Sequence, residues 1–85
     1  MIADYYEQID ALQRRLTAAG QPDIAYELEQ AVRRGSTSSE ILSETGVILG
    51  RLLDSGEAER LRLSDEVARI DRLGRELFQS TNPKW

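Results

Sequence analysis

Few side chains in this sequence are suited to acid–base or nucleophilic chemistry. The 85 residues contain no histidine and no cysteine, and the sole lysine is Lys84 near the C-terminus. Histidine, cysteine and desolvated lysine supply most general bases and strong nucleophiles in enzymes. Serine, tyrosine and carboxylate side chains remain, but a serine needs a base beside it to act as a nucleophile. We therefore expect a protein that is not an enzyme, with no catalytic residue.

Three short patterns resemble known sites, and each lacks a required residue. Glu40 and Glu44 stand one helical turn apart and could hold a divalent cation, but no calcium loop or Glu-x-x-His motif accompanies them. The run 35–39 has the composition of a phosphate loop without its lysine. Ser55 follows an aspartate but precedes Gly56, not the leucine found at the prosthetic-group site of acyl carrier proteins. We expect neither a metal site nor a cofactor.

The middle of the chain predicts a joint between two helices. Arg33 and Arg34 suit a helix C-terminus, whose exposed carbonyls attract cations. Gly35 can take the left-handed conformation that ends a helix. Thr37 and Glu40 form a capping-box pattern, in which the Thr hydroxyl accepts the Glu40 N–H and the Glu carboxylate reaches back to the Thr37 N–H. One helix should stop at this joint and another should start.

Apolar residues recur every three or four positions along most of the chain, as in amphipathic helices. In the first segment the apolar stripe consists of Tyr5, Ile9, Leu12, Leu16 and Ala19. The pattern predicts helices over 4–19, 22–34, 38–54 and 57–79, with Gly20 and Gly56 as stops. Short loops make successive helices antiparallel. We expect an all-α protein: a compact four-helix bundle, with one domain over 1–79 and a tail over 80–85.

Two features of the predicted helices bear on packing. Gly46 and Gly50 lie inside the 38–54 helix, where each costs about 1 kcal/mol relative to alanine. Close approach of a neighbouring helix would offset that cost, so we expect both glycines at a helix contact. In the 57–79 helix, Leu61, Leu73 and Phe78 are expected to widen a core seam of apolar residues.

The charge distribution favours a protein partner over nucleic acid. The net charge is -4, and the segment 36–59 carries five acidic residues against one basic residue. Such a surface repels a phosphate backbone and attracts a basic protein. Carboxylates on the first and third helices are expected to form one shared acidic field, and tyrosines beside the apolar stripes suit binding hot spots. The predicted partner-binding residues are Tyr6, Glu7, Asp10, Tyr26, Glu40 and Glu44.

The stretch from Leu12 to Leu53 resembles small α-helical bacterial proteins of the immunity or antitoxin type. The resemblance rests on Gly20, on the helical run 28–31 (Leu-Glu-Gln-Ala) and on the segment 35–42 (Gly-Ser-Thr-Ser-Ser-Glu-Ile-Leu). It implies tight binding to a cognate toxin in the cytoplasm of the producing cell, and it transfers no contact residue. The expected function is a non-catalytic inhibitor that neutralises a toxin or effector, expected to be basic.

Two other functions stay open. A homo-oligomeric helical adaptor, including a homodimer, would need no catalytic group either. A helix-turn-helix regulator would read DNA with 48–54, but that segment is apolar where base-reading side chains should stand. We expect no nucleic-acid partner. We also expect no membrane partner, because no apolar run approaches the roughly 20 residues that span a bilayer, and no signal-peptide pattern opens the chain.

Overall fold

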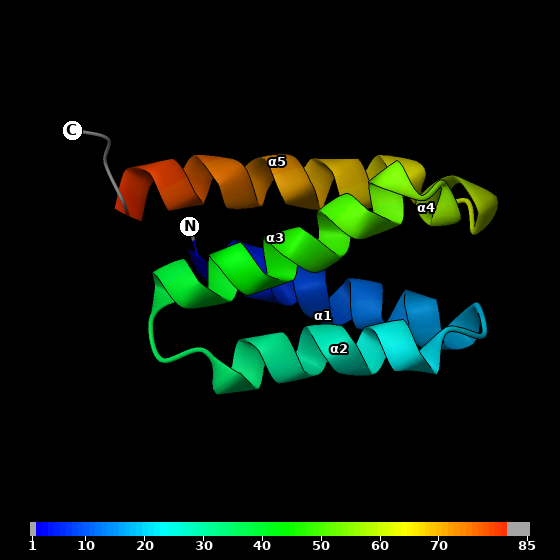
Figure 1. Ribbon diagram of the computed structural model, residues 1–85, viewed down its shortest axis with the longest axis horizontal. Helices are drawn as coiled ribbons and strands as arrows, with labels where there is room; N and C mark the ends of the chain where they lie inside the picture. The colour runs from blue at the N-terminus through cyan, green and yellow to red at the C-terminus, as the bar shows by residue number, and fades with distance from the viewer. Residues whose placement is uncertain (1, 82–85) are drawn as a thin grey trace.

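Five α-helices joined by short connections make up the computed structural model, which describes residues 2–81. The helices are α1 (Ile2–Ala18), α2 (Pro22–Arg34), α3 (Ser38–Asp54), α4 (Glu57–Arg60) and α5 (Ser64–Thr81). Figure 1 shows the four long helices running side by side, with α4 at the turn between α3 and α5. The predicted all-α bundle is confirmed. Because α5 continues to Thr81, the predicted tail begins too early, and its last four residues lie outside the described range.

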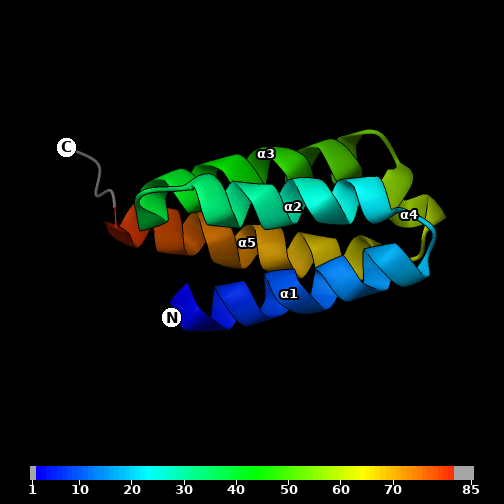
Figure 2. The ribbon, with the colours of Figure 1, turned by 90° about the horizontal axis from the view of Figure 1, so that it is seen from below.

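The four long helices occupy the four corners of the bundle. α1 packs against α2 and α5, and α3 also packs against α2 and α5. Consequently α1 and α3 stand at opposite corners, as the view in Figure 2 shows. The molecule measures 40 × 22 × 19 Å, so it is a short rod along the helix axes.

Each helix contributes one apolar stripe to a common core. The fully buried side chains recur at intervals of three and four residues along their helices, and they include Ile9, Leu28, Leu49 and Ile70. Ala19, placed in the first stripe by its spacing, lies beyond the end of α1 and is exposed. Gly20 follows with φ +83, the left-handed conformation predicted to end this helix.

A buried chain of hydrogen bonds joins the opposite corners α1 and α3. The Tyr5 hydroxyl lies 2.5 Å from Thr45 Oγ1, and Thr45 Oγ1 lies 2.7 Å from the carbonyl oxygen of Ile41. The carbonyl can only accept, so Thr45 donates its single proton to Ile41 and accepts from Tyr5. Burial raises the pKa of the Tyr5 phenol above its usual value of 10.0, which keeps it a neutral donor.

Among the glycines inside helices, Gly74 in α5 is the one with a close neighbour. A Cβ on Gly74 would lie 2.8 Å from Cε1 and 3.2 Å from the hydroxyl of Tyr5, whose ring is fully buried. Gly46 and Gly50 were predicted to have this role, and that prediction is wrong. A Cβ on either would meet no atom within 4 Å, because both glycines turn away from the core.

Alanine substitution should therefore have opposite effects at two helical glycines. In α5, Gly74→Ala is expected to destabilise the protein, because overpacking against the Tyr5 ring costs about 1–3 kcal/mol and exceeds the helix-propensity gain of about 1 kcal/mol. Gly50→Ala meets open space and should stabilise by about 0.5–1 kcal/mol. Urea unfolding of both variants measures the difference. A Gly74→Ala protein more stable than the wild type would show that the Tyr5 ring can move aside without a loss of folding free energy.

The continuous helix predicted over 57–79 is interrupted. The chain leaves α4 through Arg62, whose φ of 62 is left-handed, and the N–H of Leu63 donates to the carbonyl of Ala58 at 2.8 Å. This is a Schellman-type helix end. Leu61 and Leu63, two positions apart, cannot share one helical face. The break lets Leu63 join the buried line of α5, and Leu61 stays half-buried.

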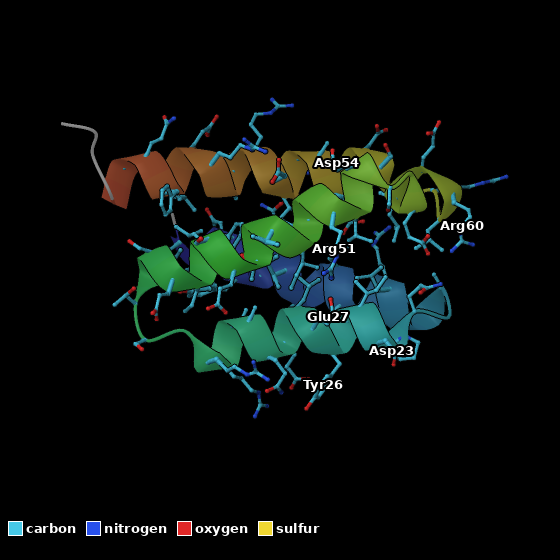
Figure 3. All side chains as sticks on the ribbon, viewed as in Figure 1. Asp23, Tyr26, Glu27, Arg51, Asp54 and Arg60 are labelled. Atoms are coloured by element: carbon cyan, nitrogen blue, oxygen red, sulfur yellow. The ribbon has the colours of Figure 1, made fainter. Side chains whose placement is uncertain are left out.

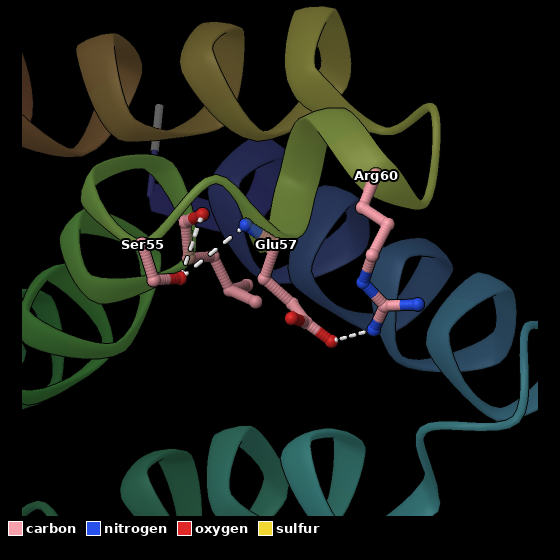
Figure 4. A network of polar contacts seen from close by, with 4 residues as sticks. Ser55, Glu57 and Arg60 are labelled. Carbon is pink, nitrogen blue, oxygen red and sulfur yellow. Dashed lines mark hydrogen bonds and ion pairs between the residues drawn. The ribbon is translucent and has the colours of Figure 1, made fainter.

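The turn from α3 into α4 is closed by local polar contacts. Gly56 has φ +79 and ends α3 as predicted. Ser55 Oγ accepts the N–H of Glu57 at 3.3 Å, and the Glu57 carboxylate pairs with Arg60 (Figure 4). These contacts fix where α4 starts and so set the direction in which the chain approaches α5.

The start of α3 confirms half of the predicted capping box. The Glu40 N–H donates to Thr37 Oγ1 at 3.2 Å, but Glu40 Oε1 accepts from the Ser36 N–H at 2.7 Å instead of from Thr37. That hydrogen bond lowers the pKa of Glu40. Gly35 is extended, with φ -65, so its predicted left-handed conformation is wrong. Glycine is needed there for another reason: a Cβ would collide with the Ile41 side chain.

Candidate protein-binding face

Three large apolar side chains are exposed among the described residues. Tyr26 on α2 is 60% exposed, Val47 on α3 is 64% exposed and Phe78 on α5 is 39% exposed. The prediction that Phe78 belongs to the core is wrong, because the buried line of α5 passes through residues 67, 70 and 74. The three helices that carry these side chains form the side of the molecule seen in Figure 1, and we name it the α2–α3–α5 face.

The first hollow on this face lies between α3 and α5. It has a volume of about 410 Å³. The buried side chains of Tyr5 and Leu42 contribute to its lining, and Val47 and Phe78 are its exposed apolar residues. Its remaining lining residues are Ser43, Gly46, Asp71, Gly74, Arg75 and Gln79. Its two charged residues are paired, since Arg75 Nε lies 2.9 Å from Asp71 Oδ2.

The second hollow lies between α2 and α3 and has a volume of about 380 Å³. Its lining consists of Tyr26, Glu27, Gln30, Ala31, Arg34, Glu44, Val47, Ile48 and Arg51. Glu27 and Arg51 form an ion pair between the two helices, and Figure 3 shows these two side chains between α2 and α3. The hollow therefore combines an apolar rim with charged groups of both signs.

Val47 lines both hollows and forms the ridge between them. Its exposure follows from the helical period, because the α3 residues 41, 45, 48, 49 and 52 point into the core and position 47 faces the opposite way. The charges of the two hollows balance. Together they are lined by three acidic residues, Glu27, Glu44 and Asp71, and by three basic residues, Arg34, Arg51 and Arg75.

Two of the six predicted partner-binding residues line this face. Tyr26 and Glu44 both line the hollow between α2 and α3. Glu40 is exposed at the start of α3, and its carboxylate accepts a hydrogen bond from the Ser36 N–H. Tyr6 is half-buried against the core, with its ring edge-on to that of Tyr5 at a centroid distance of 6.4 Å.

The structure separates the remaining two acids from this face. Glu7 and Asp10 are exposed on α1, and Asp10 pairs with Arg14 on the same helix. Because α1 and α3 stand at opposite corners, their outer carboxylates do not form the shared acidic field that was predicted. Sequence reasoning also missed Val47. Its signal was present, since Val47 is an apolar residue on the side of the 38–54 helix opposite the stripe.

The face offers contact surface for apolar side chains, with charges at its edges. In the described part of the chain, no three acidic, histidine or cysteine side chains gather into a possible metal site. None of the described helices is both long enough and apolar enough to cross a membrane. Comparison of the chain with family models, with curated proteins and with solved structures finds no match. The resemblance to immunity and antitoxin proteins therefore stays a prediction.

Proposed function

We propose that this protein is a non-catalytic binding module that docks another polypeptide on the α2–α3–α5 face. One observation carries the proposal: the three exposed large apolar residues all line two adjacent hollows that share Val47. Burial of an exposed valine or phenylalanine side chain contributes roughly 1.5–3 kcal/mol. A central apolar anchor with polar neighbours is the usual composition of a binding hot spot.

Inhibition of a toxin is a narrower form of this proposal. Its support is the resemblance of residues 12–53 to immunity and antitoxin proteins, together with the net charge of -4. The balanced charges of the two hollows give no added preference for a basic partner. A homo-oligomeric adaptor fits the same face, because both signs of charge are present on it.

Site-specific photo-crosslinking tests the proposal. A benzoylphenylalanine at position 47, in cells that produce the chain, should give a discrete adduct of higher mass, because Val47 lies at the centre of the proposed contact. The same amino acid at position 69 is the control, since Arg69 is exposed on α5 and lines neither hollow. No adduct from position 47, or equal adducts from both positions, would rule out this face as the binding surface.

A further inference from the structure

The outer side of α3 presents an acid, an apolar residue and a base in sequence. Glu44, Val47 and Arg51 are all exposed and lie at intervals of three and four residues, so they follow one line on the helix surface. We name these three residues the α3 strip. From Glu44 to Arg51 the strip extends over two helical turns, about 10 Å along the axis. Val47 stands near its middle.

This order of charges is self-complementary in one orientation. If two copies of the α3 strip meet antiparallel at Val47, Glu44 of each copy comes level with Arg51 of the other copy. Two ion pairs then flank a contact between the two Val47 side chains, as an isologous two-fold interface requires. Parallel strips would instead place like charges opposite each other, which disfavours that arrangement.

The fold leaves the strip accessible to a second helix. α3 occupies a corner of the bundle, with α2 and α5 set back on either side (Figures 1 and 2). Gly46 lines the hollow on the α5 side of Val47, and an added Cβ on Gly46 would meet no atom within 4 Å, so this flank of the strip is open. The hollows on either side of Val47 provide space for partner side chains. Packed helices cross at an angle, so the region of contact between the two helices is confined to the two turns of α3 that carry the strip.

We infer that the polypeptide docked at this face is a second copy of this chain, held antiparallel through the α3 strip. The inference rests on the proposed function and names its partner. The Arg51 side chain is 59% exposed, so its guanidinium, which contacts Glu27 within its own chain, can also reach across the interface. One helix against one helix is a small interface, so association is expected at a Kd on the order of 100 µM.

Charge exchange tests this arrangement by sedimentation velocity from about 1 µM to 1 mM. The wild-type mass should rise with concentration from 9.6 kDa towards twice that value. Glu44→Arg or Arg51→Glu alone should weaken self-association at least about ten-fold, because each creates like-charged pairs. Mixing the two variants restores both opposite-charge pairs and should restore the dimer, as should the two substitutions in one chain. Circular dichroism checks that every variant is folded.

The outcomes separate this inference from the proposed function. Arg69→Glu is the matched control and should dimerise like the wild type, since it lies outside the α3 strip. A wild type that stays at 9.6 kDa throughout, or a dimer unaffected by Glu44→Arg, overturns the inference. A mixture of the single variants that stays monomeric overturns it as well. If position 47 crosslinks to a different polypeptide while the chain stays monomeric, the proposed function stands and the self-association does not.

Discussion

Replacing Leu49 by alanine is expected to lower the free energy of unfolding by about 2–5 kcal/mol. Leu49 lies on α3 in the common core and is fully buried. Its truncation removes apolar contacts and leaves a cavity that the surrounding helices can only partly fill. A domain of this kind has a total stability of about 5–15 kcal/mol, so the loss is a large fraction of the whole. Urea denaturation followed by circular dichroism measures it.

Val47→Ala is the matched control for this substitution. Val47 is also apolar and lies on the same helix, but it is 64% exposed. Its truncation should change the stability of the monomer by less than about 0.5 kcal/mol. Similar losses for Leu49→Ala and Val47→Ala would contradict the orientation of α3 described above. The comparison is made at low concentration, where self-association does not contribute.

The second large effect is expected at the hydrogen bonds between α1 and α3. Thr45→Val keeps the shape of the side chain but removes the acceptor for the Tyr5 hydroxyl, which is then buried without a partner. That substitution should cost about 1–3 kcal/mol. Tyr5→Phe should cost less, about 0.5–1.5 kcal/mol, because Thr45 keeps its hydrogen bond to the carbonyl of Ile41.

A double-mutant cycle measures the coupling between these two residues. The double variant lacks both hydroxyl groups, so no hydroxyl is left buried without a partner. The loss of stability of the double variant should therefore be smaller than the sum of the two single losses by at least about 0.5 kcal/mol. Strict additivity would mean that the Tyr5 hydroxyl finds another partner when Thr45 is absent. Equal single losses would contradict the direction of donation from Tyr5 to Thr45.

The elements of the fold follow from local signals in the sequence. Buried positions recur at helical spacing, Thr37 caps α3, and Gly20 and Gly56 end helices with positive φ. These features depend on neighbouring residues alone, since a cap or a stop acts within one helical turn. The break before α5 has local signals too, although a continuous helix was predicted there. Leu61 and Leu63 are two positions apart, and the acidic residues Asp65 and Glu66 follow Ser64, as is usual in the first turn of a helix.

The glycines show where local reasoning fails. A glycine inside a helix signals either close contact or exposure, and the residue type does not distinguish the two. Gly74 meets the ring of Tyr5, whereas Gly46 and Gly50 meet no neighbouring atom. The difference depends on which helix is adjacent and on its axial position, and both are set by the packing of segments that lie far apart in the sequence.

The sequence by itself determined that this protein is helical, which residues fill most of the core, and that the usual catalytic groups are missing. Composition and period are properties of the chain, so they need no knowledge of how helices are placed. Only the tertiary structure decided which outward residues share a surface. It set the acids of α1 and α3 at opposite corners and placed Tyr26, Val47 and Phe78 along two adjacent hollows that share Val47. A helical period gives the direction of a side chain about its own axis, whereas neighbouring surface residues arise only when the helices assemble.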